Sequence, residues 1–546
     1  MKDIFQVLKK KKLQSFFLFY ILLLLPILTP LAENYSWMDK LLLVVVCLLL
    51  FMAISVICVF VSPRTEKIIY SVMLVFAIIP GSIFLSYLLF AHVMLEQNSV
   101  MSLFETNPEE SKEFLANYMN VWVIVGTLAY AAVPIVMICR MKRYTPLKAR
   151  FYKGHIIVSV LIIVAIVSLA RVARSVYFIN IYRTFITYKV RVHHEKKTIR
   201  ARQSEPFDIR TIYADTIPQT IVVVIGESLT KDHMSLYGYQ RKTNPLLEQY
   251  TDSFLLVYRE VISPQVHTIP VMRAALSMAE PDYPEYFEER PSLIELYNRL
   301  GFETYMITNQ AFSEKCHSSY DILLTLAKHK YNFAPKKQYD EIVFTAFDEI
   351  MESDKGKDKF ILIHLIGSHM AYEYRYPYTF DTFDYEEDGL IEEKPFRKTK
   401  EKRMIDNYDN SVLYNDYIVD RMIRQLQEES PNAMLLYFSD HGEELYDYRK
   451  FAGHVYEKVS PPMCEVPFLL WMSSYFRDKR SGLVFDAYRP YSTGDFIYSM
   501  SDISGMRYEG FDSKRSIFSP DFEPKERFVD EKAYDDILER FDSNKR

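Results

Sequence analysis

The amino-acid sequence predicts an N-terminal transmembrane domain of five helices, followed by a C-terminal α/β domain with a parallel sheet. Two features of the 546-residue chain predict this arrangement. Long apolar runs crowd roughly the first 180 residues, enough for several membrane-spanning helices. The rest of the chain contains most of the charge, and there short apolar runs alternate with helical stretches, as in α/β domains.

Composition excludes several classes of protein. The net charge of −5 comes from 65 basic and 70 acidic residues and gives no support to nucleic-acid binding. With 15 glycines and 5 cysteines, the chain is neither collagen-like nor a small disulfide scaffold. The separation of apolar from charged residues excludes a plain cytosolic enzyme and a disordered chain.

Five apolar segments are long enough, at about 20 residues, to cross a bilayer as helices. Lysines precede the first segment, as in a signal peptide, but its apolar stretch is long and TPLA is a poor cleavage site, so we expect it to be retained. Arg171 and Arg174 interrupt the last segment, where they can extend to the membrane surface. The predicted segments are residues 13–32, 41–62, 68–95, 121–139 and 156–178.

Lysine and arginine predict the orientation of these segments. The N-terminus has five basic residues, the second loop two and the fourth loop six, whereas the first and third loops have almost none. Since loops rich in basic residues stay in the cytoplasm, the N-terminus is predicted to be cytoplasmic. Five crossings then place the rest of the chain outside, in the periplasm or at the cell surface.

The segment after the apolar runs alternates aromatic or aliphatic side chains with arginine and lysine over residues 177–192. It can lie on the membrane surface as an amphipathic helix, or form a stalk helix that packs on the next domain, and both remain open. A polar passage over residues 203–218 predicts a linker. The predicted domains are residues 1–178 in the membrane, 179–215 as the amphipathic and linker segment, and 216–546 as the soluble domain.

Five strands are predicted in the soluble domain, and three of them are nearly continuous apolar runs. Such runs are typical of parallel strands that are buried on both faces. The predicted strands are residues 221–225, 303–307, 360–365, 434–438 and 466–472.

Residues that can bind a metal follow three of these strands. Glu227 follows the first strand, His369 the third, and Asp440 with His441 the fourth. Ligand sites of open α/β sheets lie beyond the carboxyl ends of the strands, and zinc binds carboxylate oxygen and histidine nitrogen. His454 lies on a later loop that can return to the same place. Alone, Glu227 is explained as a helix cap and Asp440-His441 as a turn, whereas the whole set predicts a metal site.

Thr268 is the candidate nucleophile. It precedes Pro270 in TIPVMRAALS, which predicts the start of a helix with Thr268 as the cap and Pro270 in the first turn. Backbone N–H groups at a helix N-terminus favour a phosphate or an oxyanion. Capping alone would explain the threonine; beside a metal, its hydroxyl can be deprotonated and attack phosphorus.

Five motifs, in this order, resemble the phosphoethanolamine transferases of Gram-negative envelopes: VVVIGES, MSLYGYQRKTNPLL, HTIPVMRAALS, HLIGSH and YFSDHGEELYD. The five preceding membrane segments match that family as well. The likeness is greatest to the cysteine-poor branch that modifies the lipopolysaccharide core or other surface acceptors. It implies a soluble domain with the alkaline-phosphatase-like (sulfatase-like) fold, in the periplasm of a multi-pass protein of the bacterial inner membrane.

The resemblance also implies roles for the candidate residues. Glu227, Thr268, Asp440 and His441 would bind Zn2+, with Thr268 as the catalytic nucleophile. His369 and His454 would hold the substrate phosphate or a second zinc ion. The matching nucleophile position of sulfatases favours Thr268 over Ser228 and Thr230, but many relatives place the threonine further from the proline, which leaves Ser263 as a rival.

Two further points follow from the resemblance. In the third loop, Thr106 and Glu110 resemble positions near the head group of the lipid donor, although a helix start capped by Asn107 explains them equally well. Outside the membrane segments only Cys316 and Cys464 remain, so one disulfide at most is possible there.

The implied reaction transfers phosphoethanolamine from phosphatidylethanolamine to an envelope glycolipid, lipid A or lipopolysaccharide core, through a covalent phospho-threonine. Three alternatives remain: a glycerophosphate transferase of the lipoteichoic-acid-synthase type, usually with Mn2+, a membrane-anchored sulfatase-fold hydrolase, and an inactive sensor or scaffold. A formylglycine sulfatase would need cysteine or serine in place of Thr268, and an inactive copy would have lost some metal ligands. The acceptor, the number of zinc ions and the oligomeric state stay open.

Overall fold

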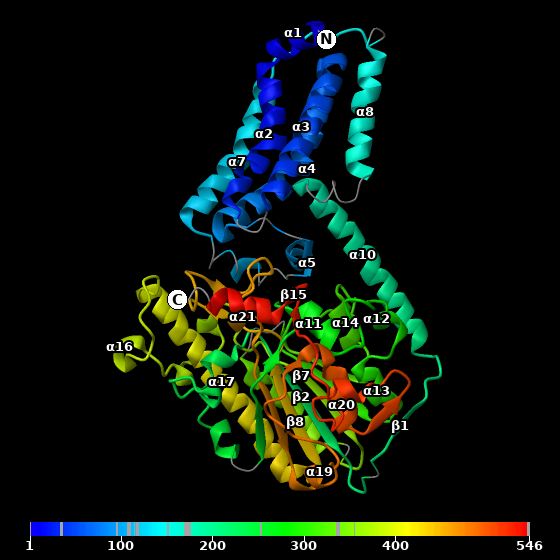
Figure 1. Ribbon diagram of the computed structural model, residues 1–546, viewed down its shortest axis with the longest axis vertical. Helices are drawn as coiled ribbons and strands as arrows, with labels where there is room; N and C mark the ends of the chain where they lie inside the picture. Colours follow the sequence, from blue (N-terminus) through cyan, green and yellow to red (C-terminus); the bar gives the residue numbers. More distant parts are fainter. Residues whose placement is uncertain are drawn as a thin grey trace. The chain divides into compact units, whose positions relative to one another are not determined.

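The chain forms two compact units, Met1–Val190 and Arg191–Arg546 (Figure 1). The structure is a computed structural model. It describes residues 2–32, 36–93, 95, 97–105, 111–113, 115, 119–149, 152–168, 176–213, 215–251, 254–334, 339–353 and 355–542.

The first unit is built from apolar helices that run beside one another (Figure 1). Among its described residues, four helices are long and apolar enough to cross a membrane, and they overlap the first four predicted segments: Lys12–Leu31, Trp37–Phe60, Pro63–Ala91 and Val121–Arg140. A shorter apolar helix, α8 (Lys153–Ser168), begins the fifth predicted segment. Because Arg171 and Arg174 lie outside the described residues, the fifth crossing stays a prediction. The helices of this unit are α1 (Lys2–Lys10), α2 (Lys12–Leu28), α3 (Trp37–Phe60), α4 (Pro63–Ala91), α5 (Gln97–Glu105), α7 (Val121–Arg140), α8 and the first part of α10 (Tyr177–Arg202).

A buried ion pair joins three of these helices at one end. Lys11, between α1 and α2, lies 2.8 Å from Glu66 in the first turn of α4, and the two side chains are only 2% and 5% exposed. Lys11 also donates to the carbonyl of Cys58 near the end of α3, and Tyr70 donates to Glu66. These contacts pair the two buried charges with each other and with polar neighbours, which offsets the cost of removing the charges from water.

The second unit contains a seven-stranded sheet in the order β3-β11-β8-β2-β7-β5-β6. The five strands from β8 to β6 are parallel, and β11 is antiparallel to both of its neighbours. All five predicted strands are present, whereas β3 and β6 were not predicted. The strands are β2 (Thr220–Gly226), β3 (Leu255–Tyr258), β5 (Glu303–Thr308), β6 (His329–Asn332), β7 (Lys359–His364), β8 (Ala433–Ser439) and β11 (Phe468–Met472).

Helices pack on this sheet and complete the core. The long helix α17 (Thr399–Glu429) packs on β8, and α13 (Leu293–Arg299) and α15 (Val343–Glu352) pack on β5. Every residue of β2, β7 and β8 is buried, as their apolar runs predicted. The other elements are α11 (Thr268–Ala275), α12 (Tyr286–Glu289), α14 (Ser319–Leu324), α16 (Tyr385–Asp388), α18 (Pro461–Cys464), α19 (Ser474–Asp478), α20 (Phe496–Ile503), α21 (Tyr534–Asp542), β1 (Ile209–Thr211), β4 (Val261–Ile262), β9 (Glu444–Leu445), β10 (Ala452–Gly453), β12 (Tyr491–Ser492), β13 (Met506–Tyr508), β14 (Phe528–Val529) and β15 (Lys532–Ala533).

The segment between the apolar helices and the sheet is more structured than its sequence suggests. Helix α10 continues past residue 192 to Arg202. Strand β1, within the predicted linker, pairs antiparallel with β13. The chain after α10 therefore runs beside the C-terminal part of the unit. The cysteines are all free, so Cys316 and Cys464 form no disulfide.

Replacing Lys11 with methionine should destabilise the first unit by about 3–5 kcal/mol, because it leaves Glu66 charged and buried without its partner. The double variant Lys11→Met, Glu66→Gln should recover most of this loss. Thermal unfolding of the full chain in detergent measures both. Equal stability of the single variant and the unchanged protein would show that the ion pair contributes nothing.

Candidate metal centre and active site

The parallel strands place three potential ligands at one edge of the sheet. Strand β2 lies between β7 and β8, and its last residue, Gly226, pairs with Ser439 at the end of β8. The next residues of the two strands are Glu227 and Asp440, followed by His441. The ligand atoms of Glu227, Asp440 and His441 all lie within 4.8 Å of one another, and all three residues are buried.

The geometry of these three side chains fits a metal ion. The Nε2 atom of His441 lies 3.3 Å from Glu227 Oε1 and 3.5 Å from Asp440 Oδ2. The Nδ1 atom of His441 donates to the carbonyl of Gly442 at 2.9 Å, which leaves Nε2 to bind a metal. Within the described part of the chain, Asp440 Oδ2 and His441 Nε2 are buried and have no hydrogen-bond partner. Two carboxylates and an imidazole are donors that zinc prefers.

The charges of this cluster shift the pKa values of its members. Burial, followed by the negative charge of Glu227, raises the pKa of Asp440 to about 7. Burial acts in the opposite direction on His441, but the carboxylates of Asp440 and Glu227 raise its pKa to about 10. For Glu227, burial is outweighed by the positive imidazolium of His441, 3.3 Å away, so its pKa is lowered. A bound cation would replace the proton on His441, and its affinity would therefore fall as the pH falls.

Thr268 lies beside this cluster. The structure corrects the prediction that it caps the helix: His267 occupies the cap position, and Thr268 is the first residue of α11. Its hydroxyl faces the cluster rather than the backbone, because it donates to Glu227 Oε2 at 3.2 Å. Among the rivals, Ser228 also donates to Glu227 but is fully buried, and Ser263 donates to the carbonyl of Gln265 instead.

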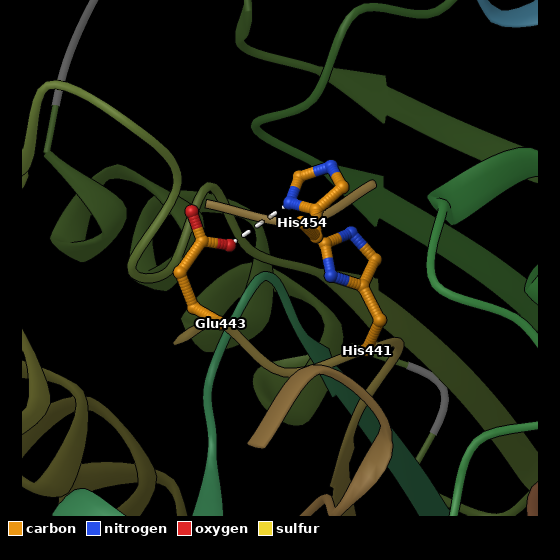
Figure 2. Close-up of side chains that lie close together, drawn as sticks. All are labelled: His441, Glu443 and His454. Carbon is orange, nitrogen blue, oxygen red and sulfur yellow. Dashed lines mark hydrogen bonds and ion pairs between the residues drawn. The ribbon is translucent and has the colours of Figure 1, made fainter. Parts of the chain in front are cut away.

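A second group of possible ligands adjoins the first. Figure 2 shows His441, Glu443 and His454, whose ligand atoms also lie within 4.8 Å of one another. His454 Nδ1 lies 2.9 Å from Glu443 Oε2, and Tyr372 donates to Glu443 Oε1 at 2.9 Å. Burial raises the pKa of Glu443 to about 7. Glu443 was not predicted, although its position two residues after His441 could have indicated that it lies near the site.

Of the remaining predicted residues, only His369 is among those that the structure describes. His369 directly follows Ser368, whose backbone nitrogen donates to the carbonyl of Glu227 at 2.9 Å, so it lies beside the first group. Thr106 and Glu110 lie outside the described residues. Gln310 was not predicted, and it donates to Glu227 Oε2 at 3.0 Å.

His364 supports the cluster from inside the sheet. This β7 residue is fully buried, its Nδ1 lies 2.7 Å from the hydroxyl of Tyr320, and its Nε2 lies 3.8 Å from Glu227 Oε2. Two glycines allow the surrounding loops to approach closely. A Cβ atom would lie 2.7 Å from the backbone nitrogen of Glu227 at Gly367, and 2.0 Å from the carbonyl oxygen of Pro462 at Gly442.

Replacing Asp440 and His441 together with alanine should remove bound metal, because Glu227 alone cannot hold it. Elemental analysis of the purified full chain measures the metal content. A matched control removes Glu303 and His329, an acid and a histidine paired elsewhere in the unit, and should keep the metal. Full metal occupancy in the Asp440, His441 double variant would place the metal elsewhere.

Residues 219–506 match the Sulfatase family. Phosphoethanolamine transferase EptC of Escherichia coli (strain K12) is 29% identical over 508 residues, which are 88% of this chain and 87% of that protein.

Two solved structures are similar as well. The C-terminal periplasmic domain of EcEptC from Escherichia coli, in complex with Zn, is 32% identical with a TM-score of 0.56, over 60% of this chain and 93% of that one. The integral membrane protein lipooligosaccharide phosphoethanolamine transferase A (EptA) from Neisseria meningitidis has a TM-score of 0.67 over 93% of this chain and 98% of that one. At 19% identity, the latter shows a shared fold. The chain is therefore a membrane-anchored enzyme of the sulfatase family and belongs to its phosphoethanolamine transferases.

Proposed function

We propose that this enzyme transfers phosphoethanolamine from phosphatidylethanolamine to a glycolipid of the bacterial envelope, lipid A or the lipopolysaccharide core. One observation supports this most directly: the hydroxyl of Thr268, at the start of α11, faces Glu227 beside Asp440 and His441. A hydroxyl, an acidic metal cluster and a helix N-terminus together suit transfer of an anionic phosphoryl group. The names of the relatives supply phosphoethanolamine as the group transferred.

Glu227, Thr268, Asp440 and His441 would hold one Zn2+ ion. The unpaired buried atoms of Asp440 and His441 support this ligand set, as does the zinc complex of the related EptC domain. When bound, zinc supplies a Lewis acid that lowers the pKa of the threonine hydroxyl and stabilises negative charge.

The side chains of the site then perform two transfers in sequence. The Thr268 oxygen forms a bond to phosphorus as the bond from phosphorus to the diacylglycerol oxygen breaks. The proton that the Thr268 hydroxyl loses is balanced by the proton that the diacylglycerol oxygen takes up as it departs. An oxygen of an acceptor phosphate or hydroxyl next forms a bond to phosphorus as the bond from phosphorus to the Thr268 oxygen breaks. The Thr268 oxygen regains a proton, which the acceptor group loses, and phosphoethanolamine stays on the acceptor.

His369 and His454 are proposed to bind the oxygens of the transferring group or, with Glu443, a second zinc ion. Burial, then the charge of His441, lowers the pKa of His454, so its ring is neutral and Nε2 can accept a metal or donate to phosphate according to its tautomer. Zinc titration of the purified protein distinguishes these roles by its stoichiometry.

The membrane part is proposed to bring the catalytic unit to its lipid substrates. We place the protein in the bacterial inner membrane, with a cytoplasmic N-terminus, five crossings and the catalytic unit in the periplasm. The distribution of basic residues supports this orientation. Thr106 and Glu110 of the third loop would then lie on the periplasmic side, near the head group of the donor.

Thr268→Ala should abolish the covalent intermediate and lower the turnover rate more than about 1,000-fold, because the nucleophile is lost. Thr268→Ser keeps a hydroxyl and should retain roughly a tenth of the activity. Intact-mass analysis after incubation with the donor detects the adduct, and Ser263→Ala is the control that should keep it. Phosphoethanolamine on Ser263 or Thr230 would assign the nucleophile elsewhere.

Cells that express the enzyme should carry phosphoethanolamine on lipid A or on the lipopolysaccharide core, and cells that express Thr268→Ala should not. Mass spectrometry of extracted lipopolysaccharide measures the added group and places it on the lipid or the sugars. Glycerophosphate in its place would favour the glycerophosphate transferase alternative.

A further inference from the structure

The last turns of α10 belong to the catalytic unit and carry a fully buried charge. Glu195 is 0% exposed, although it lies on a helix rich in charged residues. Its carboxylate accepts from Arg273 at 2.5 Å and from the hydroxyl of Ser319, at the start of α14, at 2.6 Å. Arg191, one turn earlier on α10, lies 3.8 Å from it. With these partners, the Glu195 carboxylate is part of a buried ion-pair contact and is not a solvated surface charge.

Arg273, the main partner of Glu195, lies on the helix that begins with Thr268. Its guanidinium is also held on a second side, since it donates to the carbonyl of Pro284 at 2.9 Å and lies 4.0 Å from the centre of the Phe287 ring. The side chain is therefore fixed between α10 and the segment that leads into α12.

Helix α11 needs such an anchor because it is short. It has 8 residues, too few to be stable by itself, so its orientation comes from its tertiary contacts. Arg273 is five residues after Thr268, about 7.5 Å along the helix axis at ~1.5 Å per residue. A shift of Arg273 would therefore tilt or slide the whole helix and move the Thr268 hydroxyl relative to Glu227, from which it lies 3.2 Å away.

We propose that Glu195 is a positioning residue for the reaction. Through Arg273, it holds α11 in the orientation that directs the hydroxyl of Thr268 to the metal cluster. The helix that leads out of the membrane part thus contributes a residue on which the alignment of the nucleophile depends. This inference rests on the proposed function only for its kinetic consequence, because the anchoring of α11 is a property of the fold.

A second buried ion pair on α10 provides the matched comparison. Arg202 pairs with Glu295 of α13 and donates to the carbonyls of Phe287 and Glu288. Glu295, like Glu195, is a buried carboxylate paired with an arginine, but α13 contributes none of the proposed ligands. Glu195→Gln and Glu295→Gln are therefore the same chemical change, and only the first removes a charge that is paired directly with a residue of α11.

The test uses the full chain in detergent, with a water-soluble short-chain phosphatidylethanolamine as the donor. Hydrogen–deuterium exchange by mass spectrometry follows the peptide that contains residues 268–276, and steady-state kinetics give kcat and KM. Glu195→Gln should speed exchange in this peptide and lower kcat about 10–100-fold with KM unchanged, as expected for a misplaced reacting group. Arg273→Lys, which keeps the charge but loses the planar fork, should do the same.

Glu295→Gln should leave both the exchange of residues 268–276 and kcat unchanged, even where its thermal stability falls as much. Unchanged exchange in Glu195→Gln and Arg273→Lys would overturn the inference, and so would an equal loss of kcat in Glu295→Gln. If Glu195→Gln does not fold, Glu195→Asp replaces it in the same comparison, since it keeps the charge and shortens the reach by one methylene. If the unmodified protein does not react with the donor, the proposed function is refuted. The exchange measurement would still show whether Glu195 and Arg273 hold α11 in place.

Discussion

Two carboxylates, those of Glu227 and Asp440, are buried close together at the ends of neighbouring strands, and the arrangement of the catalytic unit depends on compensating them. Burying an unpaired carboxylate costs several kcal/mol, and two adjacent ones also repel each other. The surrounding groups are donors: the imidazole of His441, the amide of Gln310, the backbone nitrogen of Ser228 and the hydroxyl of Thr268. These donors leave one oxygen of Asp440 unpaired, on the side where His441 Nε2 lies. The same repulsion that makes the cluster costly would favour a bound cation, and the hydroxyl of Thr268 lies beside the cluster.

Sequence patterns were sufficient to predict the centre of the sheet and the first group of candidate ligands. Strands β2, β7 and β8 are continuous apolar runs because both of their faces are buried, and such runs are visible without any knowledge of tertiary contacts. Residues that directly follow these strands must meet at one edge, so Glu227, Asp440 and His441 could be grouped from their positions alone. The first four apolar helices were equally visible, since their length and composition reflect the bilayer.

The rest depended on contacts that no local pattern records. Strand β6 is short and mostly exposed, with polar residues such as His329 and Asn332, and so it has no apolar signature. Gln310 and Glu443 reach the site through the fold rather than through a motif, and the orientation of the Thr268 hydroxyl follows from where α11 is held. Strand β1 lies in a passage whose polar composition is typical of a linker, because its partner β13 is almost 300 residues later in the chain. Pairing over that distance leaves no trace in the neighbouring residues.

The free cysteines have a consequence for how the catalytic unit is made. Cys316 and Cys464 are both buried as thiols, and burial raises the pKa of Cys464, so its reactive thiolate is disfavoured. The unit therefore acquires its fold from its core and its polar clusters, with no covalent cross-link to form. Because Cys316 and Cys464 form no cross-link, a reducing agent should leave the fold of this unit unchanged.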